Sequence, residues 1–193
     1  MLNAAYALSK AAEDGIRPRR SILFLNVAGE EKGLLGSRYY SDHPLFPIEK
    51  TVANLNTDMI GRIDEKHEKE GVTDYVYVIG GVLISSGLDS LLHVANEKTG
   101  DIILSDRFND LNDPNQFYRR SDHWNFGRLG VPFIFFFTGV HKDYHQPGDE
   151  VDKILFKKYQ KIVKTIYGTA ILTANADKRP KVDNQAFIKK TQE

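Results

Sequence analysis

The stretch S-I-L-F-L-N-V, residues 21–27, decides the fold that this sequence predicts. It is a nearly unbroken apolar run, the pattern of a central strand that is covered on both faces. A break at Ala28-Gly29 ends the run, and the adjacent acids Glu30 and Glu31 follow at once. In an α/β sheet, the loops at the carboxyl ends of the strands carry the active site. Neighbouring carboxylates repel each other, so the pair indicates bound cations or two separate tasks. Taken alone, however, two acids are more often part of a solvated loop.

Strands and helices alternate along the rest of the chain, which predicts a mainly parallel sheet in an α/β layer fold. Further strands are expected at residues 51–58, 75–79 and 132–137. Helices are expected from the start of the chain to Gly15, over 34–40, before Gly100, from a cap at Ser121 to Gly130, and from Phe156 onward. Residues 1–175 form the expected domain, and residues 176–193 are expected to be a polar, frayed tail.

The composition excludes several classes of protein. The 193 residues suit one domain, and 26 basic side chains balance 26 acidic ones, so no net field favours nucleic acid or an anionic membrane. No apolar run approaches the roughly 20 residues that span a bilayer. The first ten residues do not read as a signal peptide. Cysteine is absent, which excludes disulfides, thiolate metal sites and cysteine nucleophiles.

Three predicted strand ends offer oxygen or nitrogen ligands. They are Glu30-Glu31, Asp58 in N-L-N-T-D-M-I-G-R, and His145 in D-Y-H-Q-P-G-D. Zinc favours imidazole and carboxylate ligands when no thiol is available. Singly, Asp58 reads as a turn or cap acid and His145 as a hydrogen-bonded loop residue. Their shared position at strand ends favours a metal site.

Four blocks of the sequence, in order, resemble zinc-dependent exopeptidases of the M28 aminopeptidase type. They are R-S-I-L-F-L-N-V-A-G-E-E-K-G-L-L-G-S-R-Y-Y, N-L-N-T-D-M-I-G-R, S-D-H-W-N-F-G-R-L-G-V-P and D-Y-H-Q-P-G-D-E. The resemblance implies a three-layer α/β/α fold with a mainly parallel mixed sheet, peptide substrates and two zinc ions in the complete family site. It also suggests a secreted or periplasmic protein, although this chain shows no signal peptide.

The resemblance also implies roles for individual residues. Glu30 matches the general base and acid, and Tyr118 matches a tyrosine that stabilises the tetrahedral intermediate in some members. Glu31 and His145 match the ligands of one zinc, and Asp58 matches a ligand of the other. The neighbouring pair Asp122-His123 is expected to be structural rather than ligating.

The chain departs from the family pattern at its start, because the H-x-D motif and the metal-bridging aspartate have no counterpart in it. We therefore expect the 193-residue chain to be N-terminally incomplete, inactive by itself and a weak zinc binder. The alternative is a non-catalytic remnant of the fold that binds peptides or a partner chain. A zinc-dependent acyltransferase of the same fold, such as a glutaminyl cyclase, is a third possibility without support in these residues.

Overall fold

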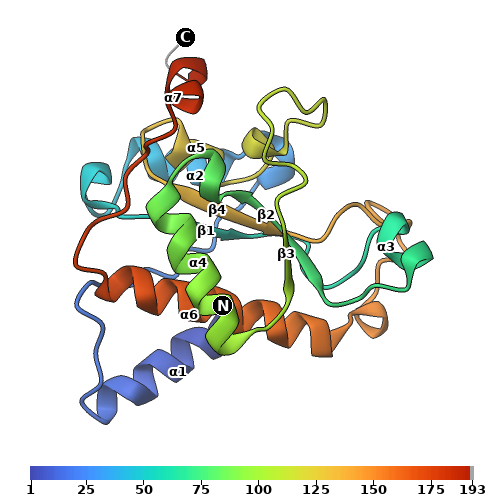
Figure 1. Ribbon diagram of the computed structural model, residues 1–193, viewed down its shortest axis with the longest axis horizontal. Helices are drawn as coiled ribbons and strands as arrows, with labels where there is room; N and C mark the ends of the chain where they lie inside the picture. Colours follow the sequence, from blue (N-terminus) through green and yellow to red (C-terminus); the bar gives the residue numbers. More distant parts are fainter. Residues whose placement is uncertain (192–193) are drawn as a thin grey trace.

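A four-stranded mixed sheet forms the centre of the molecule in the computed structural model, which describes residues 1–191 (Figure 1). The strands lie in the order β1-β4-β2-β3. Their bounds are β1 (Asn54–Thr57), β2 (Tyr75–Gly80), β3 (Ile103–Ser105) and β4 (Phe133–Phe137). The pairs β1–β4 and β2–β3 are parallel and β2–β4 is antiparallel, which confirms the mainly parallel mixed sheet.

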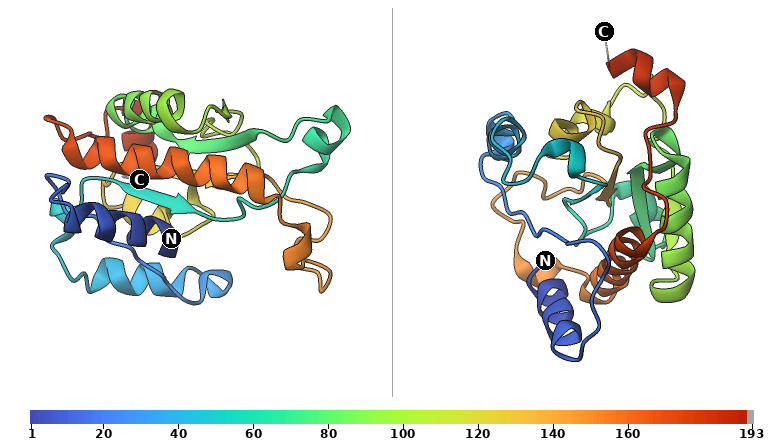
Figure 2. Two further views of the ribbon diagram at one scale, coloured as in Figure 1. Left: turned by 90° about the horizontal axis from the view of Figure 1, so that it is seen from below. Right: turned by 90° about the vertical axis from the view of Figure 1, so that its left-hand side faces the viewer.

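Helices lie on both faces of this sheet, so the α/β/α prediction is also confirmed. The helices are α1 (Leu2–Glu13), α2 (Leu35–Asp42), α3 (Glu65–Glu70), α4 (Ser86–Thr99), α5 (Trp124–Gly127), α6 (Phe156–Asn175) and α7 (Gln185–Thr191). Single 3₁₀ turns are η1 (Glu30–Lys32), η2 (Ile48–Lys50), η3 (Gly81–Leu83), η4 (Phe117–Arg119) and η5 (Val151–Lys153). Figure 2 shows α4 and α6 packed together on one side of the sheet and α2 on the other. Within residues 1–191, no helix is both long and apolar enough to cross a membrane.

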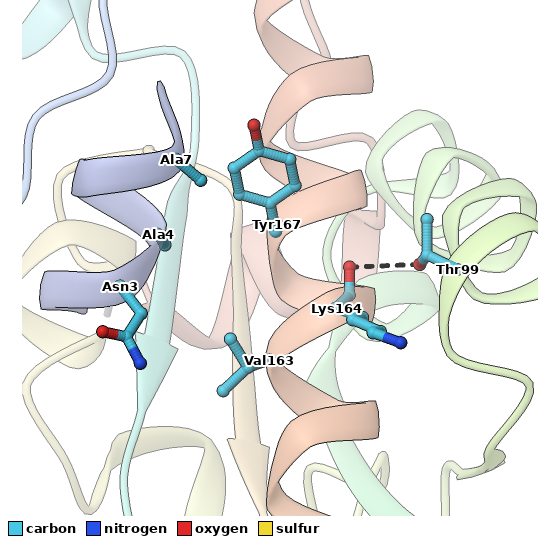
Figure 3. A pocket seen from close by; sticks show the side chains of 7 residues that line it. All are labelled: Asn3, Ala4, Ala7, Thr99, Val163, Lys164 and Tyr167. Atoms are coloured by element: carbon cyan, nitrogen blue, oxygen red, sulfur yellow. Dashed lines mark hydrogen bonds between the residues drawn. The ribbon is translucent and has the colours of Figure 1, made fainter. Parts of the chain in front are cut away.

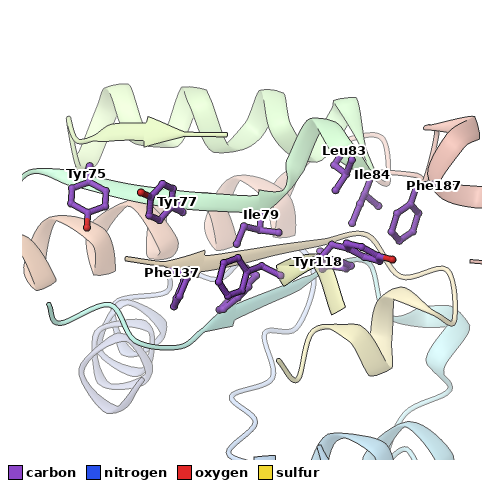
Figure 4. Packing of buried hydrophobic residues seen from close by; sticks show 11 residues of the cluster. Tyr75, Tyr77, Ile79, Leu83, Ile84, Tyr118, Phe137 and Phe187 are labelled. Carbon is purple, nitrogen blue, oxygen red and sulfur yellow. The ribbon is translucent and has the colours of Figure 1, made fainter. Parts of the chain in front are cut away.

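The two central strands divide their side chains between two cores. Successive side chains of a strand point to opposite faces, so β2 and β4, both fully buried, supply apolar groups to each side. On one face, alternate residues of the two strands pack with Phe117, Tyr118 and Phe187 (Figure 4). On the other face, the remaining residues pack against Leu88 and Leu92 of α4 and their neighbours on α6. This double-sided burial is why both strands are near-continuous apolar runs.

Residues 21–27 form no helix or strand and pair with no strand among the described residues, so the prediction of a buried central strand is wrong. The side chains of Leu23 and Phe24 remain 48% and 37% exposed. Leu25 alone of this segment packs against a small cluster, formed by residues of α2, α5 and the turn that follows. An apolar run supplies side chains for burial, but a strand also needs a hydrogen-bonded neighbour and a layer on each face.

Two other predictions are corrected. The helix expected from Ser121 to Gly130 is limited to α5, and the Ser121 hydroxyl donates to Asp58 rather than capping a helix. After α5 the amides of Leu129 and Gly130 form tighter turn bonds to the carbonyls of Phe126 and Gly127. The expected frayed tail instead forms α7, whose Phe187 is 1% exposed and lies edge-on to Phe133. Residues 192–193 of that tail lie outside the described residues. The short strand β3 was not predicted.

Candidate active site

The structure brings Glu30, Glu31, Asp58 and His145 to one edge of the sheet. Asp58 directly follows β1, and His145 lies in the loop after β4, the parallel neighbour of β1. The two glutamates form η1, a single turn between two glycines with positive φ. Contact between the segments is direct, because His145 Nε2 donates a hydrogen bond to Glu31 Oε1 at 2.7 Å.

The Glu31–His145 pair is open to solvent. The side chains are 65% and 52% exposed, and the ring of Tyr144 stacks on the imidazole at 3.8 Å between centroids. His145 adopts a φ of 56°, a left-handed conformation that is uncommon for a residue other than glycine. A carboxylate oxygen and an imidazole nitrogen that point at each other are two ligands of the kinds that zinc uses.

Glu30 lies beside this pair in a more buried and more acidic setting. Burial raises the pKa of Glu30 to about 7, and the charges of Asp58 and Glu31 add to the effect. The charge of Asp122 raises this pKa further, while that of His145 opposes the shift. A carboxyl group whose pKa lies near neutrality can both accept and return a proton, as a general base must.

Asp58 is held by a chain of hydrogen bonds that reaches into the core. Ser121 Oγ donates to Asp58 Oδ2 at 2.9 Å, and Asn56 Nδ2 donates to Ser121 Oγ at 3.0 Å. The same amide lies 3.4 Å from Nδ1 of the fully buried His123. Burial raises the pKa of Asp58, and the Ser121 hydrogen bond offsets part of that rise.

Two tyrosines have contrasting positions. Tyr118, the tyrosine expected from the sequence, is buried in the core with its ring edge-on to Trp124, and no described contact joins it to the four site residues. Tyr144 was not predicted, yet it stacks on His145. Burial raises the pKa of Tyr144, and the nearby negative charges of Glu31, Glu30 and Asp58 add to this. Its position next to His145 in D-Y-H-Q-P was the available sequence signal.

The residues present suit zinc in type but fall short in number. In the described part of the chain, no three His, Cys, Asp or Glu side chains converge closely enough to hold one ion. Glu31 and His145 supply two ligands, and Asp58 supplies one for a second position. Asp122 Oδ1 is buried without a hydrogen-bond partner, and its carboxylate lies near enough to raise the pKa values of Glu30 and Asp58. Such an accumulation of acids favours a cation.

A mainly apolar cavity lies elsewhere and takes no part in this site. It has a volume of about 470 Å³ and lies among α1, α4 and α6 (Figure 3). Its lining includes Ala4, Ala7, Val163 and Tyr167, and its surface is mainly apolar. None of the predicted site residues lines it.

Comparison with known proteins places these features in a family. Residues 1–170 match peptidase family M28. The chain belongs to this family. It is 28% identical over 188 residues to the aminopeptidase YwaD of Bacillus subtilis (strain 168), an alignment that covers 94% of this chain and 37% of that protein.

Solved structures show the same fold. The LapA aminopeptidase of Legionella pneumophila superposes with a TM-score of 0.60 at 16% identity, covering 90% of this chain and 46% of that one. BSAP, a zinc aminopeptidase from Bacillus subtilis, superposes with a TM-score of 0.56 at 24% identity, covering 82% of this chain and 36% of that one. This chain thus spans less than half the length of each of these M28 relatives.

Proposed function

We propose that these residues form part of a zinc-dependent aminopeptidase site, in which Glu30 is the general base and Glu31, Asp58 and His145 are metal ligands. The observation that carries the proposal is the Glu31–His145 contact at 2.7 Å, beside a glutamate whose pKa is raised to about 7. Membership of peptidase family M28 and the zinc aminopeptidase BSAP among the solved relatives support it.

The roles follow from the positions of the side chains. Bound zinc would lower the pKa of water and polarise a peptide carbonyl. Glu30, which forms no hydrogen bond or ion pair with His145 within residues 1–191, would accept a proton from the attacking water and return it to the departing amine. Glu31 and His145 face each other and would hold one metal, while Ser121 orients Asp58, which would be a ligand at the second position. The excess of carboxylates also attracts the positively charged amino terminus of a peptide, which suits an exopeptidase.

Tyr144 is the better-placed tyrosine for contact with the substrate. Its phenol stays protonated at neutral pH, since burial and three nearby carboxylates raise its pKa. A protonated phenol can donate a hydrogen bond to the oxygen that becomes negative during hydrolysis. Tyr118 retains the role that the resemblance implies only if its ring leaves the core cluster, because the ring is 4% exposed.

The 193 residues by themselves bind zinc weakly and are inactive under this proposal. Catalytic zinc usually has three protein ligands, whereas the two positions here are offered two ligands and one. The alternative, a non-catalytic peptide-binding protein, is favoured by the same shortfall among residues 1–191. Metal content separates the two, because a binding module needs no zinc.

The test compares Glu30→Gln with Glu31→Gln. Glu30→Gln should keep most of the zinc affinity, whereas Glu31→Gln should lower it strongly, because only Glu31 pairs with His145. In a longer M28 chain with activity, Glu30→Gln should also slow amide hydrolysis by about 10²–10⁴-fold. Zinc affinity is measured by calorimetry, and activity by release of amino-terminal residues from amide substrates. Equal zinc loss in the two variants would contradict the roles. Robust zinc-dependent turnover by the wild-type 193-residue chain would contradict its inactivity and point to a further ligand such as Asp122.

A further inference from the structure

One arginine connects the two loops that carry Asp58 and His145. Arg62 lies four residues after Asp58, on the segment that leaves β1. Its Nη2 donates to Asp143 Oδ2 at 2.5 Å, and its Nη1 donates to Asp149 Oδ1 at 2.7 Å. The two aspartates lie on either side of His145 in the loop after β4. A single guanidinium therefore contacts the loop on both sides of His145, at Asp143 and at Asp149.

The Arg62–Asp143 ion pair is sheltered from solvent, whereas Asp149 in the second pair is partly exposed. The side chains of Arg62 and Asp143 are each 14% exposed. Lys153 Nζ donates to the other oxygen of Asp143 at 2.9 Å and also to the carbonyl of Gly148, within the same loop. Sheltered, charge-assisted contacts with both oxygens used are the strong kind.

Hydrogen bonds hold the backbone around Arg62, and this fixes the position from which its side chain extends. Lys158 of α6 donates from Nζ to the Arg62 carbonyl at 3.0 Å, and the Leu155 amide donates to the Gly61 carbonyl at 2.9 Å. On the β4 side, Thr138 Oγ1 donates to the Met59 carbonyl at 2.6 Å. These contacts join the segment after β1 to α6 and to the start of the His145 loop.

His145 has few side-chain contacts of its own. Its side chain is half exposed, and its described side-chain contacts are those with Glu31 and Tyr144. Its left-handed backbone, with φ at 56°, is uncommon for a non-glycine residue and persists only where the surroundings impose it. The Gln146 amide donates to the Asp143 carbonyl at 2.9 Å and closes a turn that holds this conformation. The Arg62 contacts with Asp143 and Asp149 hold the chain on both sides of that turn.

We propose that Arg62 is a positioning residue that fixes the His145 loop against the Asp58 loop and thereby sets the separation of the two ligand positions. Its importance for metal binding rests on the proposed function, whereas the connection between the loops does not. The planar guanidinium is needed, because a lysine ammonium is a point charge and cannot hold two separate carboxylates in the same fixed fork.

The test follows hydrogen–deuterium exchange of residues 141–150 in the zinc-free protein. Arg62→Met should speed exchange there by roughly tenfold or more, as loss of at least one charge-assisted hydrogen bond requires. Arg62→Lys should fall between wild type and Arg62→Met. The matched control is Arg128→Met, which removes an arginine that links α5 to Ser41 and Asp42 of α2. It should leave exchange in 141–150 unchanged.

A purely structural role would give a different pattern. Unchanged exchange in Arg62→Met would overturn the proposal, and so would equal acceleration across the whole chain or in Arg128→Met. If Arg62→Met does not fold, Asp149→Asn removes only the more exposed arm, at 45% exposure, and should still speed exchange in 141–150.

Zinc titration of the same variants tests the link to the site. Arg62→Met should weaken zinc binding by roughly 10–100-fold, as loss of an outer partner of a ligand does. In a protein that already carries His145→Ala, Arg62→Met should not weaken zinc binding further. A similar loss in that background would overturn the positioning role at His145. If no variant or wild type binds zinc, the proposed function fails, while the exchange result still decides whether Arg62 connects the loops.

Discussion

His123 should make the protein sensitive to acid, because its imidazole is buried in the neutral state. It is fully buried between the rings of Phe133 and Phe135, at 4.5 and 4.6 Å between centroids. Its Nε2–H donates to the Phe117 carbonyl at 3.2 Å, which leaves Nδ1 as an acceptor facing the Asn56 amide. A second proton would place two donors against each other and disturb the hydrogen-bond chain that ends on Asp58.

The size of the stability loss at low pH follows from the pKa of His123. Burial lowers the pKa of His123 from its ordinary value of 6.5 to about 3. Above pH 6.5 both folded and unfolded chains hold a neutral imidazole, so the full stability is present. As the pH falls toward 3, the unfolded chain gains a proton that the folded chain refuses, and stability is lost. The loss reaches about 3 kcal/mol at pH 4, a large share of the ~5–15 kcal/mol that typically stabilises a domain.

The experiment compares wild type with His123→Gln, whose amide can donate to Phe117 but does not titrate. Urea unfolding at pH 7 and at pH 4 is followed through the single tryptophan, Trp124, and by far-ultraviolet circular dichroism. Wild type should lose about 3 kcal/mol more than His123→Gln between the two pH values, because the contributions of all other groups cancel in the difference. Equal losses would refute the reasoning, since they would mean that the folded protein accommodates the charged imidazole.

Two further outcomes are expected. Ser121→Ala should lower the free energy of unfolding by about 1.5–3 kcal/mol, because it removes the hydrogen bond to the half-buried Asp58 carboxylate. Thermal denaturation measures this, and Ser90→Ala, which removes an exposed hydroxyl bond on α4, should change stability little. Burial lowers the pKa of Lys158 from 10.5 to about 7. Between these pH values the Lys158 amine is protonated in the unfolded chain and mostly neutral in the folded chain, so the folded protein loses stability as the pH falls from 10.5 to 7. The stability of Lys158→Met relative to wild type should therefore be greater at pH 7 than at pH 9.5. Equal differences in urea midpoint at the two pH values would contradict this.

The sequence alone determined the elements whose apolar pattern is local and complete. Strands β2 and β4 and helices α1, α2, α4 and α6 lie where the periodicity places them, because a buried strand and an amphipathic helix each show their burial in their own residues. Short elements were missed, since three residues of β3 and seven of α7 carry too little periodicity to stand out. Residues 21–27 show the converse error, an apolar run that has no strand partner among the described residues.

For the candidate site too, the sequence predicted some features and the fold decided others. Glu30, Glu31, Asp58 and His145 could be chosen from the sequence, because each follows an apolar run that ends at an expected strand end. The convergence of Asp58 and His145 follows from β1 and β4 being parallel neighbours, whereas Glu31 joins them through its contact with His145.

Only the tertiary structure decided which side chains support the site and which do not. It placed Tyr144 rather than Tyr118 beside the carboxylates, and it joined Arg62 to aspartates more than 80 residues away. These relations depend on contacts between segments distant in the chain, and local sequence pattern carries no information about the partner of a charged side chain. Periodicity tells which face of an element is buried, whereas the packed fold determines what that face meets.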